Sequence, residues 1–464
     1  RRVFASMAEG AEASGWELTG RHVVAEYAFT DCVKGTQWSP DGTCALTASD
    51  DRWLRVFELP AAVVADLYAG GHPGEDPAGD APEEAAEGAP LEVAVAARES
   101  EGIYDYAWYP LMHSASPATC CFASSSRDNP VHLWDAFDGR LRASYTAYDQ
   151  AEEVMGAYSV AFSEDGCRII AGYERAVCVF DLSRPGRPEA VRATARTRQS
   201  RDGQRGILGA LAVAPHGTNL YAVGSYLGIT GVYTDPEGDL VCLLQGHTAG
   251  VTQVAFAPGG THLFTGARKD GRILCWDLRK PEAPVAAYAR HAPTNQRIGF
   301  SLDPSGRWLA TGSQDGRALV YDVWAGPEPG PAVAHEGPAA VNAAAFHPFG
   351  NLLAITTGER ELPRNLGLDD DDDNIADGYP AAQAVPHRLA LYRLAWSPTG
   401  PGATPTPAAD NGAVDMQTDP AGDAPQAAEA DVDATPGAGA PTAETPIPEG
   451  SPAAAAGTRT PVPE

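Results

Sequence analysis

Basic residues recur at one kind of position in this sequence, the turn that follows a strand-like apolar segment. The turns read SDDRW, SSSRDNP, GYERAV, GARKDGR and GSQDGR. They carry Arg52, Arg127, Arg175, Arg268, Lys269 and Arg317. Arginine donates paired hydrogen bonds to phosphate oxygens, and its flat guanidinium group stacks on aromatic rings and bases. If these side chains share one surface, they would bind the backbone of a nucleic acid.

Further polar and aromatic residues are expected on the same surface, close to the starts of apolar strands or in the same turns. From those turns the predicted RNA-binding set takes Arg127, Arg175, Arg268, Lys269 and Arg317, and it also contains Arg205, Arg297, Asn295, Gln296, Tyr104, Tyr106 and Tyr226. Exposed aromatic rings and arginine planes stack on the splayed bases of single-stranded nucleic acid, and amides read base edges. If it shares one exposed surface, this set could hold phosphates and stack on splayed bases.

The opposing interpretation is that these cations are ordinary solvated or ion-paired turn residues. Acidic residues lie in the same turns and cancel part of the positive field: Asp50, Asp51, Asp128, Asp270 and Asp315. For any single arginine the structural interpretation is the simpler one. The argument for binding rests on the whole set sharing one face.

Internal repeats define the fold that would position these turns. The clearest unit, residues 246–280, reads GHTAGVTQVAFAPGGTHLFTGARKDGRILCWDLRK. It has a Gly-His pair, three alternating strands and a closing Trp-Asp, which is typical of a WD-repeat blade. In it we expect a hydrogen-bonded structural tetrad of His247, Thr265, Asp270 and Trp276. Six further segments follow this template, so the sequence predicts an all-β, seven-bladed WD-repeat β-propeller.

Composition sets the expected boundaries. The formal net charge is −28, of which residues 61–100 contribute −8, residues 359–380 contribute −6 and residues 397–464 contribute −9. Segments this acidic and poor in aromatics bury little surface. We therefore expect a flexible segment 1–20, a nearly neutral propeller over 21–396 with acidic disordered insertions at about 61–100 and 359–386, and a disordered acidic Pro/Ala-rich tail at 397–464. Strand-like residues 22–29 are expected to complete the last blade.

Other classes of function find little support. The eight cysteines form no CxxC pair, so we expect no metal site and no disulfide framework, and reduced thiols fit the cytoplasm or nucleus. The run Asp369 to Asp373 lacks the glycine and glutamate of a calcium loop.

No GxSxG elbow occurs, so we expect neither an enzyme nor a cofactor. No apolar run approaches about 18 residues, so we expect no membrane span. The sequence starts at Arg1 rather than Met, and we expect a missing N-terminal segment.

Several stretches resemble the telomerase Cajal body protein family of WD-repeat proteins. They read SSSRDNPVHLWDAFDGRLRASYTAYD, YDYAWY, GARKDGRILCWDLR and TNQRIGFSLDPSGRWLATGS. The resemblance runs from about residue 29 to 360 and leaves out the acidic insertion, the aspartate run and the tail. It implies a nuclear, non-enzymatic adaptor that binds the CAB box in the loops of small Cajal-body RNAs and telomerase RNA.

The resemblance also implies partners and locations. It implies association with the telomerase holoenzyme, H/ACA core proteins and other Cajal body proteins, folding by the cytosolic chaperonin, and residence in Cajal bodies and at telomeres. The choice of RNA-binding residues remains our own, from the turn pattern. The alternative is a WD-repeat scaffold that binds proteins on the same face and meets RNA particles only through them.

Overall fold

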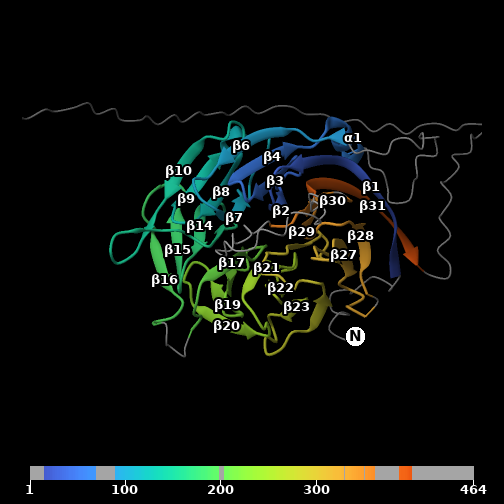
Figure 1. Cartoon of the computed structure of the whole chain (residues 1–464). Coiled ribbons are helices and arrows are strands. Elements are labelled where there is room, and N and C mark those ends of the chain that lie inside the picture. Colours follow the sequence, from blue (N-terminus) through green and yellow to red (C-terminus); the bar gives the residue numbers. More distant parts are fainter. Residues whose placement is uncertain are drawn as a thin grey trace, which may run out of the picture. The chain divides into compact units, whose positions relative to one another are not determined.

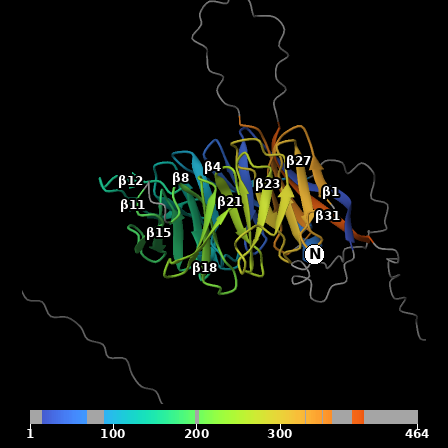
Figure 2. The same cartoon turned by 90° about the horizontal axis from the view of Figure 1, so that it is seen from below.

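The computed structural model describes residues 15–68, 89–197, 203–328, 330–349, 351–360 and 386–399. Their strands form seven blade sheets and one small two-stranded sheet. The blades are arranged in a ring around a central channel (Figure 1), and Figure 2 shows the same ring from its edge. The predicted seven-bladed β-propeller is confirmed. Residues 1–14, the aspartate run and residues 400–464 lie outside the described residues, so their disorder stays a prediction. Among the helices described, none is long and apolar enough to span a membrane.

The first three blades run as follows. The first contains β2 (Val33–Trp38), β3 (Cys44–Ser49), β4 (Trp53–Glu58) and β6 (Val93–Arg98). The second contains β7 (Ile103–Trp108), β8 (Cys121–Ser126), β9 (Val131–Asp135) and β10 (Leu141–Tyr145), with a 3-10 turn at Pro117–Thr119. The third contains β13 (Ser159–Phe162), β14 (Arg168–Gly172), β15 (Ala176–Asp181) and β16 (Ala190–Ala193). A small hairpin of β11 (Ala147–Tyr148) and β12 (Val154–Met155) precedes it.

The next three blades are regular. The fourth contains β17 (Leu208–Val213), β18 (Leu220–Ser225), β19 (Ile229–Thr234) and β20 (Leu240–Gln245). The fifth contains β21 (Val251–Phe256), β22 (His262–Ala267), β23 (Arg272–Asp277) and β24 (Ala286–Ala289). The sixth contains β25 (Phe300–Leu302), β26 (Trp308–Thr311), β27 (Arg317–Asp322) and β28 (Ala332–Glu336).

The seventh blade joins the two ends of the chain. It contains β29 (Val341–Phe346), β30 (Leu352–Thr357), β31 (His387–Thr399) and β1 (Gly15–Phe29). β1 pairs antiparallel with β31 from Gly15 opposite Thr399 to Phe29 opposite His387. The predicted closing strand is confirmed, and it extends past the expected propeller boundaries at residues 21 and 396.

The predicted insertion at 61–100 was drawn too wide. Helix α1 (Ala61–Tyr68) packs Val63 against Leu352 of the last blade, and β5 (Ala89–Pro90) pairs with β1. β6 is the outer strand of the first blade, and its Ala97 is buried. The acidic count over the whole segment concealed the alternating sequence EVAVAAR that forms this strand. Only residues 69–88 of the segment lie outside the described residues.

The hydrophobic core is divided among the contacts between neighbouring blades. One cluster packs Ile169 and Phe180 of the third blade against Val131 and Tyr145 of the second. Comparable clusters join the other adjacent blades around the ring. Because each blade buries both of its faces in this way, ring closure leaves the stacked sheets without an open end.

Polar contacts hold the fifth blade as the sequence predicted. His247 Nδ1 lies 3.0 Å from the Asp270 carboxylate, and His247 Nε2 lies 2.8 Å from Thr265 Oγ1. Trp276 Nε1 donates to the same hydroxyl at 2.9 Å. Burial lowers the pKa of His247, while hydrogen bonds from Arg272 and His247 outweigh burial and lower the pKa of Asp270. These four residues form the structural tetrad.

Acid destabilisation is expected from this tetrad. Both folded pKa values are depressed, so the stability they contribute is present above the unfolded pKa values, near 6.5 and 3.9, and is lost as pH falls. We expect the melting temperature to decline below about pH 6.5. Asp270→Asn should cost about 1–3 kcal/mol at neutral pH and remove the carboxylate's part of the acid decline, below about pH 4, while the part from His247 remains. Asp138→Asn, at an exposed turn, is the control, and identical pH profiles for both variants would contradict the account.

Ring closure makes a second prediction. Deleting residues 21–30 removes most of the pairing between β1 and β31, so we expect the melting temperature to fall by more than about 10 °C. A chain that begins at Gly15 keeps the whole strand and should melt like the full chain. Thermal unfolding followed by circular dichroism measures both, and unchanged melting of the deletion variant would refute the closing role.

Candidate nucleic-acid interface

The central channel forms a cavity of about 1110 Å³ among the described residues. Its wall comes from the inner strands β2, β7, β17, β21, β25 and β29 and from turns at both ends of them. In a four-stranded antiparallel blade, the turn after the second strand and the approach to the first strand lie at the same end. Hydrogen bonds confirm this here, since Arg127 N–H donates to Gly102 O at 3.1 Å and Arg268 N–H donates to Gly250 O at 2.9 Å. We call this end of the channel the mouth.

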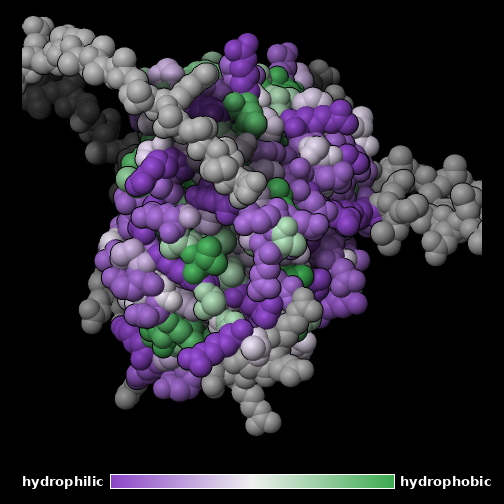
Figure 3. Space-filling model, turned by 90° about the vertical axis from the view of Figure 1, so that its left-hand side faces the viewer, coloured by the Kyte–Doolittle hydropathy of each residue, from purple (hydrophilic) through white to green (hydrophobic). Residues whose placement is uncertain are grey.

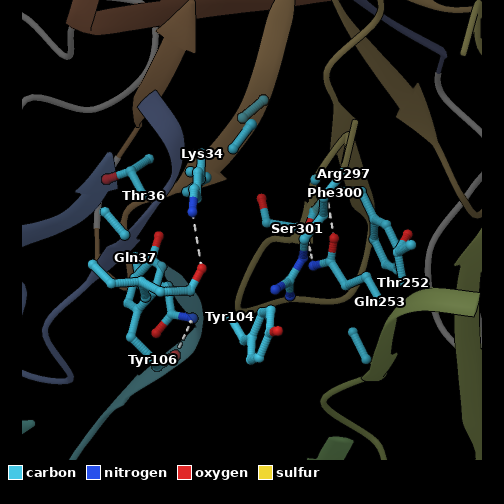
Figure 4. Close-up of a pocket in the computed structure, with 18 of the residues that line it drawn as sticks. Lys34, Thr36, Gln37, Tyr104, Tyr106, Thr252, Gln253, Arg297, Phe300 and Ser301 are labelled. Carbon is cyan, nitrogen blue, oxygen red and sulfur yellow. Dashed lines mark hydrogen bonds between the residues drawn. The ribbon is translucent and has the colours of Figure 1, made fainter. Parts of the chain in front are cut away.

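The structure brings most of the predicted set together at this channel. Eight of the twelve residues line it: Tyr104, Tyr106, Arg127, Tyr226, Arg268, Asn295, Gln296 and Arg297. They come from blades two and four, from the turn in blade five and from the connection between blades five and six. Figure 4 shows Tyr104, Tyr106 and Arg297 among the side chains around the cavity.

The other four predicted residues do not line the cavity. Arg175 Nε lies 3.6 Å from the Glu174 carboxylate, and Arg317 is paired with Asp315. The Lys269 N–H donates to Thr294 O at 3.0 Å, and its side chain is exposed. Arg205 accepts a hydrogen bond at its carbonyl from Ser225. These residues sit on the same face, so any contact with a ligand would come from outside the channel.

Three cations hold a backbone conformation that glycine adopts more easily. Arg52, Arg175 and Lys269 have φ values of 69°, 60° and 50°. The left-handed region costs an L-residue roughly 1 kcal/mol. Glycine would relieve this cost, so the turn itself does not require a long cation at these positions.

Arg127 is an open cation at the mouth. Its side chain is 66% exposed, and its Nε lies 3.3 Å from the Asp128 carboxylate. An exposed ion pair of this kind contributes about 0–1 kcal/mol. Arg127 can therefore exchange Asp128 for a phosphate oxygen at small cost.

Two tyrosines form a stacked pair beside Arg127. The ring centroids of Tyr104 and Tyr158 are 5.2 Å apart, with the planes inclined at 30°. Burial raises the pKa of both phenols, so both stay neutral at physiological pH. Tyr158 was missed from the sequence. It directly precedes the inner strand SVAF, and reading all approaches to inner strands for aromatic residues would have found it.

Tyr106 has a different environment from the one expected. Its side chain is only 7% exposed, and burial raises its pKa above the usual range. Its hydroxyl packs against Gly35 on the neighbouring inner strand. Two residues further along β7 than Tyr104, it lies where the inner strands converge. Tyr106 is therefore part of the channel wall and offers little ring surface for stacking.

Arg297 reaches across the channel to a blade that is not its neighbour. Its Nη1 lies 3.0 Å from Asp105 Oδ1 on β7, and Asp105 also accepts the Val160 N–H at 3.1 Å. Burial disfavours the guanidinium charge, but Asp105 more than offsets this and raises the pKa of Arg297. The adjacent Gln296 donates to Asn342 and to Gly358 O. The 295–297 segment thus bridges blades six, seven and two.

Two channel cations were not predicted. Lys34 Nζ donates to Ile103 O at 2.9 Å and lies 3.0 Å from Asp50, while Arg360 Nε lies 2.8 Å from the same carboxylate. The alternation in VKGTQW places Lys34 on the channel side of its strand, which is the signal that could have found it.

The described lining of the cavity carries an excess of positive charge. Six basic residues line it: Lys34, Arg52, Arg127, Arg268, Arg297 and Arg360. Three acidic residues line it: Asp50, Glu101 and Asp303. This local excess stands inside a chain of net charge −28. The described residues contain no group of three or more His, Cys, Asp or Glu that could hold a metal ion. The chemistry available at the mouth is anion binding and ring stacking.

The fold and repeats define the chain as a WD-repeat β-propeller. The WD domain, G-beta repeat family matches residues 23–58, 238–277 and 284–322. Within this class the chain is similar to proteins named telomerase Cajal body protein 1, which confirms the predicted resemblance. The Bos taurus protein of that name is 41% identical over 373 residues, covering 80% of this chain and 65% of that protein.

Two further relatives carry the same name. The Homo sapiens protein is 42% identical over 348 residues, or 74% of this chain and 60% of that protein. The Drosophila melanogaster homolog is 35% identical over 337 residues, or 70% of this chain and 57% of that protein. The chain thus spans less than two thirds of the length of these relatives. Their names and the propeller fold favour a scaffold protein over an enzyme.

The ion pair across the channel predicts that Asp105 contributes more to the free energy of unfolding than Asp128 does. Asp105→Ala leaves a partly buried guanidinium without its counter-charge, so we expect a loss of about 3–5 kcal/mol in unfolding free energy. Asp128→Asn suits the left-handed backbone at this position (φ 55°), removes only an exposed pair and should cost less than about 1 kcal/mol. Denaturant unfolding measures both, and equal losses would contradict the cross-channel role of Arg297.

Proposed function

We propose that this chain is an RNA-binding adaptor that recognises the CAB-box loop of small Cajal-body RNAs and telomerase RNA. In this role it directs these ribonucleoproteins, including telomerase, to Cajal bodies and telomeres. The observation that carries the proposal is the gathering of Arg127, Arg268 and two tyrosine platforms at one channel mouth. The names of the relatives supply the cellular context.

The mouth suits an RNA loop for physical reasons. Arg127 and Arg268 hold phosphates by charge-assisted hydrogen bonds, while Tyr104 and Tyr226 accept unstacked bases. The exposed Asn295 at the rim supplies an amide for base edges. A duplex is too wide to place its bases against groups recessed in a channel, whereas a hairpin loop presents them outward.

Protein partners belong to the same proposal. We expect the telomerase holoenzyme, H/ACA core proteins and other Cajal body proteins to contact surfaces outside the mouth. The outer strands of blades two to four expose Leu141, Val191, Leu240 and Val241. Figure 3 views that side of the propeller and shows separate hydrophobic areas within a mostly hydrophilic surface. Folding by the cytosolic chaperonin fits a ring built from long-range strand pairs.

Binding of a bare RNA hairpin tests the proposal. The full chain should bind a CAB-box hairpin with a Kd below about 1 μM and bind the same hairpin with a scrambled loop more weakly. Affinity should fall with rising salt, because phosphate contacts release counterions. The double variant Arg127→Ala with Arg268→Ala should weaken binding at least tenfold and reduce the salt slope by about 2.

A matched control uses the same two blades at the other end of their strands. Arg140 and Arg279 follow third strands, so they lie on the opposite face and are exposed. Arg140→Ala with Arg279→Ala changes net charge equally and should leave loop-dependent binding within about twofold. Equal losses in both double variants, or binding that ignores the loop sequence, would contradict the proposal. Binding only through added H/ACA proteins would favour the protein scaffold.

A further inference from the structure

The contact between Arg268 and Tyr226 differs from the other arginine contacts at the mouth. Tyr226 lies in the turn after β18, and Arg268 lies in the turn after β22 of the next blade. The guanidinium carbon of Arg268 lies 3.9 Å from the centroid of the Tyr226 ring. An arginine over an aromatic face is a cation–π contact that also fixes the plane of the guanidinium group.

Two glycines make room for this contact. A Cβ atom at Gly209 would lie 2.1 Å from a ring carbon of Tyr226. A Cβ at Gly250 would lie 2.8 Å from Tyr226 O and 3.1 Å from Arg268 Nε. Neither glycine has a positive φ, so their lack of a side chain serves close packing. The ring therefore rests directly on the backbone of β17.

The backbones on both sides of the contact are also fixed. Tyr226 N–H donates to Ile207 O, and Arg268 N–H donates to Gly250 O, each at 2.9 Å. These bonds tie the two turns to the approaches of their own inner strands. The stacked pair is therefore present before any ligand arrives, which lowers the ordering cost of binding.

Arg268 has no acidic partner among the described residues, in contrast to Arg127, Arg297 and Arg317, which each pair with an aspartate. Its Nε is buried and makes no hydrogen bond there. A guanidinium group that is stacked, unpaired and placed at the rim of a cavity has donors and a flat face to offer a ligand.

We infer that the Arg268–Tyr226 pair is the binding site for one unpaired nucleobase, and that Gly209 positions the Tyr226 ring of this pair. The base stacks on the outer face of the guanidinium group, and the in-plane guanidinium donors bind the adjoining phosphate. Tyr104, which is stacked on Tyr158, lines the same mouth and takes a second base of the loop. This inference rests on the proposed RNA-binding function and names the substrate class of the site, a single-stranded loop with at least two splayed bases.

Replacing Arg268 with lysine separates stacking from charge. Arg268→Lys keeps the positive charge but loses the flat guanidinium group. We therefore expect loop binding to weaken about tenfold, while the slope of log affinity against log salt concentration stays unchanged. Arg140→Lys, at an exposed position on the opposite face, is the control and should change affinity by less than about twofold. Hairpins with a single abasic nucleotide at each loop position identify the base involved. At that position Arg268→Lys should cause no further loss.

A second variant tests the proposed base-binding site without altering any functional side chain. Gly209→Ala drives a methyl group into the Tyr226 ring, so we expect loop binding to weaken at least tenfold, while circular dichroism shows the fold retained. If Arg268→Lys binds like the wild type and no abasic position abolishes its effect, Arg268 acts as a point charge and the inference is wrong. If the wild type shows no loop-dependent binding, the proposed function itself fails.

Discussion

The pairing of β1 with β31 is the constraint on which the rest of this structure depends. It joins the first and last described strands in one blade, from Gly15 opposite Thr399 to Phe29 opposite His387. Each blade buries its faces only against its two neighbours, so an open ring would expose the faces at its ends. Ala25 of β1 and Leu391 of β31 lie in one buried cluster with Val33 of the first blade. Closure therefore stabilises the first and seventh blades together.

Closure of the ring also fixes the channel and the turns that surround its mouth. The seven inner strands converge, and the turns at one end of them meet around a single mouth. Residues far apart in the sequence become neighbours there, as Arg297 and Asp105 show with an N–O distance of 3.0 Å. The acidic chain thus keeps a local excess of basic groups in its channel. A charge map of the whole chain would conceal this feature, because most of the acidic residues lie in the segments between and beyond the strands.

Much of this architecture could be predicted from the sequence, because strand alternation and turn residues are local signals. The repeat gave the blade count, the tetrad of His247, Thr265, Asp270 and Trp276, and the closing strand. The width of the 61–100 insertion was wrong, because an acidic average concealed β6. At the site, turn position predicted which cations share a face, but it could not tell which of them meet carboxylates. Arg317 pairs within its own turn, and Arg297 pairs across the ring. The burial of Tyr106 and the stacking of Tyr158 depend on how neighbouring blades converge, which no single repeat encodes.

The account makes one central claim, that an RNA loop occupies the channel mouth. The most direct measurement is photo-crosslinking of a CAB-box hairpin carrying 4-thiouridine in its loop, followed by mass spectrometry of the crosslinked peptides. The account predicts crosslinks in the peptides that contain Tyr104, Tyr226 and Arg268, and their loss when an unlabelled hairpin competes. Crosslinks confined to the outer strands β16 and β20, or to the opposite face near Arg140, would contradict it.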